Sequence, residues 1–378
     1  MKRILFSVGL LLFISNIIFS QTVNTIEPLC DTCNKELYMR FESTSFLKNN
    51  EYFNSFTKGF TGIGFIAKPT FEYYLSNKTK INAGLYLLKY SGRNKFKYIS
   101  PIFSVEYQIN KKIRLIIGSI YGKLNHQLEE PLYRYDRSYQ DNTENGVQLL
   151  WKTSRVQSDL WMNWKKFILR NDPFQEEITG GNTTIFNILT SNKLNISVPF
   201  QFLVFHKGGQ IDSSPDPVAS ILNGSTGLKF YYKVNNNTFG FEPSVFFYQG
   251  WGLPDSGVNS QLYNKGSALY IKTVYNHKQF YSMLGFWSAD KFIAPNGEYL
   301  FQSVSELNNT FSEDKRQLIT AKIGFKKKIS SSFNIELRAD GYYDIINRDF
   351  SHSVGLYLSV NEAFFLKRIK TKNEILKE

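Results

Sequence analysis

Few residues of this chain have the types and the spacing that catalysis or metal binding requires. Cys30 and Cys33 form a CxxC motif near the N-terminus, and the chain has 4 His. A structural zinc site needs further ligands at fixed spacing, and a redox CxxC belongs to a βαβ setting; the sequence has neither pattern. We therefore expect a local disulfide between Cys30 and Cys33, as is usual in an oxidising compartment, and we expect no metal and no cofactor.

Hydrolysis by a serine requires a histidine close to the hydroxyl, because the hydroxyl needs an adjacent base to become a nucleophile. On one β-strand, the two side chains must be two residues apart to lie on the same face. Ser351, His352 and Ser353 are adjacent in the stretch DFSHSVG, so each serine points away from the histidine. The other histidines also lack a serine two residues away: His126, His206 and His277. The sequence therefore predicts that the chain is not an enzyme; a lipid hydrolase is the main rival class.

Three polar stretches between the expected strands have compositions suited to binding. Leu128 to Asp141 interleaves tyrosines with charged residues, which suits stacking on sugars or docking a partner. Asn171 to Glu177 and Gly208 to Asp216 contain carboxylates that could hold Ca²⁺, but neither has the spacing of a known calcium loop. We interpret all three as exposed loops.

The N-terminal stretch of the sequence indicates export. The sequence opens MKRILFSVGLLLFISNIIFSQ, with two basic residues before an apolar run, and this predicts a signal peptide over residues 1–20. No later apolar run approaches the roughly 18 residues that a membrane helix needs. The formal charge is +13, which we assign to solvated turns and a basic tail, because nucleic acid is not expected as a partner of an exported protein.

A period of two dominates the rest of the sequence. In FNIELRADGYY, Phe333 to Tyr343, apolar residues alternate with Glu336, Arg338 and Asp340, which is typical of a strand with one apolar and one wet face. About sixteen such segments can be counted, although fourteen is also compatible, and short turns alternate with long loops such as 124–145, 207–221 and 289–315. Four prolines fall inside the expected strands and predict bulges or interruptions there: Pro69, Pro101, Pro199 and Pro243.

This pattern predicts an all-β fold, a closed antiparallel transmembrane β-barrel with short periplasmic turns and long extracellular loops. We expect the barrel over residues 36–365, preceded by a periplasmic segment at 21–35 that could form a small plug, and followed by a basic periplasmic tail at 366–378. A charge on the lipid face would cost about 2 to 4 kcal/mol at mid-bilayer, so the charged face must line the lumen. The expected lining residues mix both signs: Arg40, Glu42, Lys68, Glu72, Glu106, Arg114, Asp159, Glu242, Lys272, Lys322, Lys326, Glu336, Arg338 and Asp340.

The alternation resembles the bacterial outer-membrane β-barrel class, particularly its porins of sixteen strands. The resemblance implies a location in the outer membrane of a Gram-negative bacterium, contact with its lipid, and insertion by the barrel assembly machinery. It implies a porin-like channel for passive diffusion of small hydrophilic solutes. A transporter of apolar solutes plugged by residues 21–35, and a non-conducting barrel subunit of a secretion or surface-assembly complex, remain alternatives. Oligomers or partner proteins would bind through the long loops.

These alternatives differ in single-channel conductance. The porin interpretation predicts steady conductance of the refolded barrel in a planar bilayer, because a tube of sixteen strands is wider than wall side chains can fill. The plugged interpretation predicts conductance only after residues 21–35 are deleted. If neither the intact barrel nor the variant without residues 21–35 conducts, and heat-modifiable gel migration shows that both are folded, the non-conducting subunit would be favoured.

Overall fold

The computed structural model describes residues 29–30, 32–209, 211–215, 217–252, 263–308 and 310–369. The expected signal peptide (residues 1–20), residues 21–28 of the expected periplasmic segment, and residues 370–378 of the expected tail lie outside this part of the chain. The last strand ends at Arg368, three residues beyond the expected end of the barrel at 365. The described residues are nearly all strand and the loops that connect the strands.

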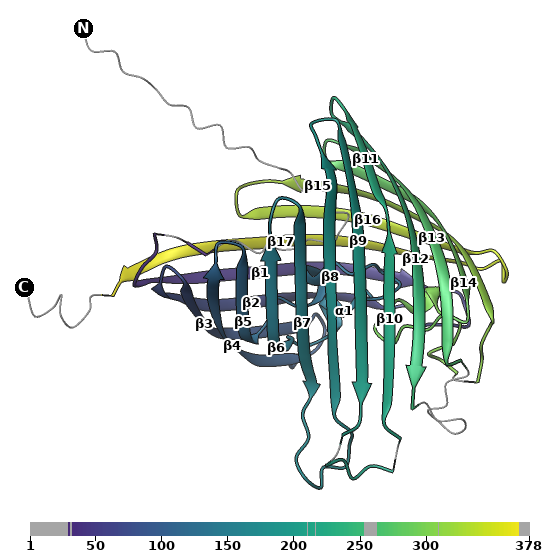
Figure 1. Cartoon of the computed structure of the whole chain (residues 1–378), viewed down its shortest axis with the longest axis horizontal. Coiled ribbons are helices and arrows are strands. Elements are labelled where there is room, and N and C mark those ends of the chain that lie inside the picture. The colour runs from purple at the N-terminus through teal and green to yellow at the C-terminus, as the bar shows by residue number, and fades with distance from the viewer. Residues whose placement is uncertain are drawn as a thin grey trace, which may run out of the picture.

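In the described residues, the strands follow one another along the chain with three short helices between them (Figure 1). None of the helices in the described residues is long and apolar enough to cross a membrane. The helices are η1 (Lys123–His126), α1 (Arg137–Gln140) and η2 (Tyr299–Phe301). The strands are β1 (Glu36–Glu51), β2 (Thr61–Ser76), β3 (Thr79–Tyr90), β4 (Tyr98–Asn110), β5 (Ile113–Ser119), β6 (Asn145–Lys152), β7 (Val156–Lys166), β8 (Glu177–Thr190), β9 (Leu194–Lys207), β10 (Ala219–Gly227), β11 (Lys229–Val234), β12 (Asn237–Trp251), β13 (Lys265–His277), β14 (Phe280–Asp290), β15 (Lys315–Lys328), β16 (Phe333–Asp344) and β17 (Phe350–Arg368).

Antiparallel pairing between consecutive strands closes the sheet into a barrel. β1 pairs with β2 on one side and with β17 on the other, so the first and last strands seal the ring. β10 and β11 both lie between β9 and β12 and continue in one register, so they are two parts of a single strand. The barrel therefore has 16 strands, and the prediction of a closed antiparallel barrel of about this size is confirmed.

Two of the four prolines explain the interruption between β10 and β11. Pro199 on β9 and Pro243 on β12 flank this point from either side, and neither has an N–H to donate to the strand between them. Their carbonyls are still used, because Leu228 N–H donates to Pro243 O at 2.9 Å and the Thr226 hydroxyl donates to Pro199 O at 3.0 Å. The expectation of an interruption at these prolines is therefore met at this strand.

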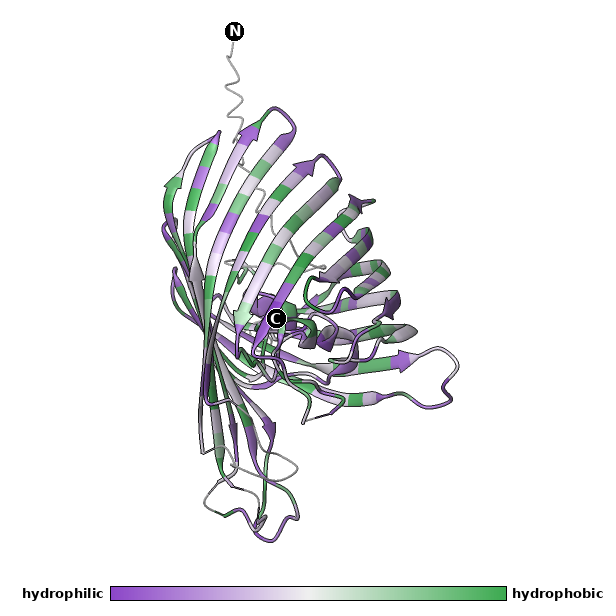
Figure 2. Cartoon of the chain, turned by 90° about the vertical axis from the view of Figure 1, so that its right-hand side faces the viewer, coloured by the Kyte–Doolittle hydropathy of each residue, from purple (hydrophilic) through white to green (hydrophobic). Residues whose placement is uncertain are grey.

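Each strand presents its apolar side chains outward and its polar side chains inward. On β16, Leu337 is 49% exposed, whereas the neighbouring Glu336 and Arg338 are 1% and 5% exposed. Figure 2 shows the same alternation as bands of hydrophobic and hydrophilic residues along the strands. Because all backbone groups pair within a closed ring, only this apolar outer face meets the lipid.

The two rims of the barrel differ. Short turns join β2 to β3, β4 to β5 and the later pairs up to β15 and β16, and the barrel's first and last strand ends, Glu36 and Arg368, lie side by side. We call this end the short-turn rim and the opposite end the long-loop rim. Two of the long loops, residues 120–144 and 291–314, fold back inside the barrel (Figure 2). We call them the first and second plug segments.

The outward face makes a depth-dependent prediction for β14. Leu284 lies at the middle of this strand and is 57% exposed on the outer face, whereas Phe280 begins it at the short-turn rim and is 59% exposed. Leu284→Arg should lower the free energy of unfolding by about 2 to 4 kcal/mol and Phe280→Arg by only about 0 to 1 kcal/mol, because a charge near the interface reaches water. Denaturant titration of the barrel in lipid vesicles measures both; equal losses would mean that Leu284 does not face the bilayer centre.

Candidate functional site

A ladder of ion pairs covers the inner wall of β1 to β5. Arg40 Nε lies 2.9 Å from Glu72 Oε1, Lys80 Nζ lies 3.3 Å from the same carboxylate oxygen and 2.9 Å from Glu106 Oε1, and Arg114 is 3.2 Å from Glu106. Lys80 and Glu106 are directly opposite in the register of β3 and β4, and the other pairs are diagonal neighbours on adjacent strands, which long charged side chains can bridge. Lys80 was not among the expected lining residues, because it directly follows a turn. Next to this ladder, Lys68 and Glu42 pair at 3.5 Å.

The remaining charges expected in the lumen also point inward. Glu242 pairs with Lys272 at 2.9 Å, Arg338 pairs with Asp340 at 3.0 Å, and Tyr281 donates its hydroxyl to Glu336 at 2.9 Å. Lys326 is aligned with Glu336 in the register of β15 and β16. The structure thus places the expected charges on the inner face, paired either across neighbouring strands or, for Arg338 and Asp340, along one strand.

Carboxylates of the first plug segment complete several of these wall pairs. Lys272 of β13 binds Glu129 at 2.6 Å, and Lys322 of β15 binds Glu130 at 2.5 Å. On β1, which follows β16 and β17 in the ring, Lys48 lies 3.5 Å from Asp136. The segment is therefore fixed to the arc of the wall from β13 to β1. The stretch that we interpreted as an exposed loop, Leu128 to Asp141, is instead packed inside. That interpretation was wrong because the tyrosines and charges of this stretch match partners on distant strands.

The two plug segments contact each other and share one apolar core with the wall. Arg134 N–H donates to Asn296 O at 2.7 Å, which joins the segments through their backbones. Leu132, Phe292 and Phe301 are fully buried against inward residues of β7, β9, β10 and β12 to β16. Trp287 of β14 donates its indole N–H to Phe301 O at 3.1 Å. Protein therefore fills the lumen at this level.

His126 is the most enclosed ionisable side chain of the first plug segment. Its Nδ1 lies 2.7 Å from Asp159 Oδ2, its Nε2 lies 2.9 Å from Glu144 Oε2, and its ring stacks on Trp161 at 3.9 Å. Burial alone would lower the pKa of His126, but the two carboxylates raise it to about 9. His126 is therefore an imidazolium that joins the plug to β7, and it has no nucleophile to activate.

A serine and a histidine do meet on the outer face, near the long-loop rim. His206 is the second-last residue of β9 and Ser220 the second residue of β10, and the register places them directly opposite each other. His206 Nδ1 lies 2.8 Å from Ser220 Oγ. Both alternate with inward residues, Phe205 and Ile221, which pack against the lumen core, so the pair faces the lipid side.

Because Ser220 was expected in a loop, and because His206 has no serine two residues away on its own strand, this arrangement was not predicted from the sequence. Adjacent strands bring directly opposite side chains to about 4.5 to 5.5 Å between Cβ atoms, as close as residues two apart on one strand. The register that aligns β9 with β10 would have revealed the pair. His352, by contrast, faces outward beside Phe350, its ring stacked at 5.7 Å, and its flanking Ser351 and Ser353 point inward as expected.

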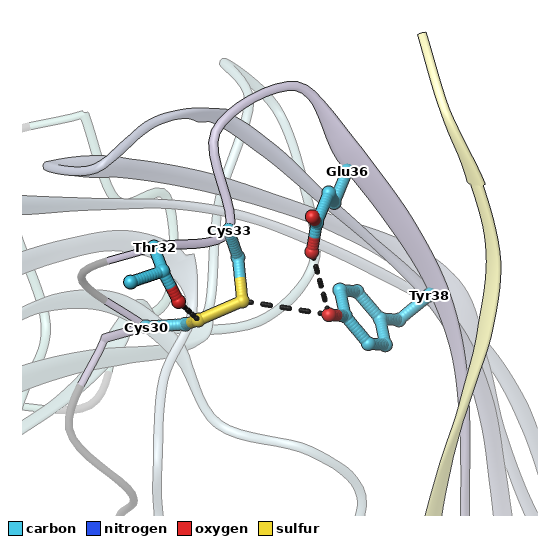
Figure 3. The surroundings of a disulfide bond; sticks show 5 residues. All are labelled: Cys30, Thr32, Cys33, Glu36 and Tyr38. Carbon is cyan, nitrogen blue, oxygen red and sulfur yellow. Dashed lines mark hydrogen bonds between the residues drawn. A yellow bond between two sulfur atoms is a disulfide. The ribbon is translucent and has the colours of Figure 1, made fainter.

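Cys30 and Cys33 are joined by a disulfide at the short-turn rim (Figure 3). Cys33 Sγ lies 3.4 Å from the Tyr38 hydroxyl, which donates to Glu36 at 2.7 Å. Leu29 and Cys33 pack on Tyr74, an inward residue of β2. The described part of the expected periplasmic segment therefore lies against the wall, and the central filling of the lumen comes from the two long loops. In the described residues, no cluster of His, Cys, Asp and Glu is arranged to hold a metal ion.

The His126 contacts predict how the plug depends on pH. His126→Phe keeps the stacking on Trp161 but leaves two buried carboxylates without their cation, which should lower the free energy of unfolding by about 3 to 5 kcal/mol. A raised pKa stabilises the fold fully below the ordinary value of 6.5, and this contribution is lost as the pH rises through about 9. The difference between wild type and variant in denaturant titrations should therefore shrink from pH 6 to pH 9. His277→Phe, at the short-turn rim, is the control; a pH-independent difference would contradict the charged imidazolium.

A family model and solved structures match this chain. The family is described as lipid A 3′-O-deacylase-type, and its model matches residues 29–369. Among curated proteins, none is similar enough to count as a relative. A BenF-like porin from Pseudomonas fluorescens Pf-5 is 10% identical, with a TM-score of 0.50, and covers 88% of this chain and 100% of its own. OprD from Pseudomonas aeruginosa is 10% identical with a TM-score of 0.48, and the match covers 88% of this chain and 95% of OprD. A loop-deletion mutant of OmpT from Vibrio cholerae is 12% identical with a TM-score of 0.49, and the match covers 86% of this chain and 98% of the mutant.

At these identities the structural likeness concerns the fold alone. The porin-like barrel of 16 strands is as predicted, and together with the apolar outer face it places the protein in the outer membrane. The family match extends over almost all of the described residues. The chain belongs to the lipid A 3′-O-deacylase-type family.

Proposed function

We propose that this barrel hydrolyses an acyl ester of an outer-membrane glycolipid at the long-loop rim, with Ser220 as the nucleophile and His206 as the base. The observation that carries the proposal is the 2.8 Å contact between His206 Nδ1 and Ser220 Oγ on the outer face. Membership of a family named for deacylation supports it. It reverses our prediction from the sequence that the chain is not an enzyme, because that prediction rested on the lack of such a pair.

The position of the pair suits a substrate held in the membrane. Long loops lie on the outer side of such barrels, so the long-loop rim faces the outer leaflet, where a glycolipid has its acyl esters close to its head group. Trp251 is opposite Ser220 on β12 and is 52% exposed, and Ile178 is opposite His206 on β8. The hydroxyl is thus bordered by apolar side chains that an acyl chain can contact.

The proposed reaction needs only these two groups, an ester and water. His206 takes the proton of the Ser220 hydroxyl, Oγ bonds to the ester carbonyl carbon, and the bond from this carbon to the sugar oxygen breaks as His206 returns the proton to that oxygen. Water then attacks the acyl-serine, its proton passes through His206 to Oγ, and the fatty acid leaves.

Glu176 is the candidate for orienting the histidine. Glu176 directly precedes β8, and its carbonyl accepts a hydrogen bond from Gly208 N–H at 2.9 Å. It is two residues from Ile178, toward the long-loop rim, so it lies on the same face and diagonal to His206. Because Nδ1 contacts the serine, Nε2 is the nitrogen that a carboxylate would hold. Glu176 would act as a positioning residue through His206.

The test is the acyl content of glycolipid extracted from cells that express the barrel. Wild type should release one or more ester-linked acyl chains, seen by mass spectrometry, and Ser220→Ala and His206→Ala should each reduce release by at least about 10³-fold, since the residues of such a pair act as a unit. Glu176→Gln should reduce the rate less and shift its pH profile.

His277→Ala is the matched control, because it removes a histidine at the opposite rim and should leave release unchanged. All variants must show heat-modifiable migration of the folded barrel. Equal acyl content in cells with wild type and with Ser220→Ala would rule out this assignment. If Ser220→Ala keeps full activity while His206→Ala loses it, the nucleophile is another residue.

A second candidate function is the porin-like passage of small hydrophilic solutes. It is favoured by a charged pocket in the lumen, lined by wall residues of β17 and β1 to β5 and by the first plug segment. Passage through the rest of the lumen requires both plug segments to move away from the wall. Conductance that appears only when their contacts are removed, for example in Lys272→Met with Lys322→Met, would support this function. The plugged transporter, the non-conducting subunit and an oligomer remain predictions.

A further inference from the structure

A pocket lies inside the barrel between the wall and the first plug segment, far in the fold from the His206 and Ser220 pair. It contains about 1090 Å³ of space, part of it continuous with solvent. Its wall residues belong to β17 and β1 to β5, and residues 120–123, 125 and 143–144 close it on the side of the plug. Tyr74, which borders the pocket, also packs on the disulfide segment at the short-turn rim. Ile102, Ile120 and Tyr86 supply apolar surface.

Nearly every charge in and beneath this pocket is balanced by a partner. Arg40, Lys80 and Arg114 share Glu72 and Glu106. Lys68 pairs with Glu42, whose carboxylate it approaches to 3.5 Å. The imidazolium of His126 lies between Glu144 and Asp159. These groups amount to five cations and five anions, so together they carry no net charge.

Lys123 is an additional cation in the pocket. Its ammonium donates to the Tyr86 hydroxyl at 3.0 Å and to the Asp141 backbone carbonyl at 2.8 Å, and neither acceptor carries a charge. The Asp141 carboxylate is held by Arg137 at 2.6 Å. In the described part of the chain, Lys123 forms no ion pair. Its backbone has a φ of 60°, a left-handed conformation that costs energy in a residue other than glycine and is often found at functional sites.

We propose that the pocket binds a small organic monocarboxylate, with the Lys123 ammonium as its counterion. One unmatched positive charge suits one negative charge, because a buried charge is costly until it is paired. The apolar and aromatic wall suits the carbon chain of such a ligand better than an inorganic ion. The site is separate from the proposed hydrolytic pair, so either assignment can fail without the other.

The titration of Lys123 supports this assignment. Burial, and then the nearby Lys68 ammonium, lower the pKa of Lys123 to about 7. The other charged or titratable groups facing it are Tyr86 of β3, Arg137 of α1, Asp141 directly after α1, and Glu144 ahead of β6. Because a carboxylate binds the protonated amine, binding should be stronger at pH 6 than at pH 8.

The experiment measures butyrate binding to the full refolded barrel in detergent by saturation-transfer NMR. Butyramide, which has the same shape without the charge, and sodium chloride at equal ionic strength are the reference ligands. We expect butyrate to bind, and we expect that neither butyramide nor chloride displaces it. The affinity of Lys123→Met for butyrate should be at least about tenfold lower, the factor that corresponds to loss of one modest ion pair. Lys112→Met, in the exposed turn between β4 and β5, should bind as wild type does.

Several results would overturn the assignment: no butyrate binding, equal binding of butyramide, displacement by chloride, or unchanged affinity in Lys123→Met. If Lys123→Met does not fold, two measurements on the wild type decide. Preference for butyrate over butyramide, with stronger binding at pH 6 than at pH 8, supports the site, and lack of either contradicts it. Acyl release by Ser220 is measured separately, so a negative result here leaves that assay interpretable.

Discussion

The need to pair every backbone N–H and C=O within the bilayer governs this structure. An open sheet would leave its edges unpaired in lipid, so β1 must meet β17, and the ring must be complete. Once closed, each strand has one face toward lipid and one toward the lumen, and the period of two assigns every side chain to one of them. The apolar outer face, the charged inner face and the wide interior all follow from that closure.

A ring of sixteen strands encloses more space than its own side chains fill, and in this protein the long loops occupy much of it. The filling combines an apolar core, centred on Leu132, Phe292 and Phe301, with ion pairs from Glu129 and Glu130 to lysines of the wall. Buried charges of this kind are tolerated because each has a partner, and removing one partner leaves the other unpaired in a dry environment. Such pairs select one position for the plug segments more than they add net stability.

The exceptions to this pairing carry the functional argument. On the outer face, His206 and Ser220 form a polar contact where apolar residues are the rule, and they lie close to the rim where a glycolipid head group meets its acyl chains. In the lumen, Lys123 donates to two uncharged oxygens and forms no ion pair with any described residue, while the ions around it are matched. Polar groups in these positions reduce stability, and a substrate or ligand offers a physical reason for keeping them.

The strand period, the inward direction of Glu336, Arg338 and Asp340, and the rhythm of short turns and long loops could all be predicted from the sequence, and together they imply the barrel. These are local properties, since alternation and turn residues act over a few neighbouring positions. Three other features became visible only in the folded chain: Leu128 to Asp141 fills the lumen, His126 is held by Glu144 and Asp159, and His206 meets Ser220. Those contacts depend on the register between strands and on the paths of long loops, which join residues that no local pattern relates.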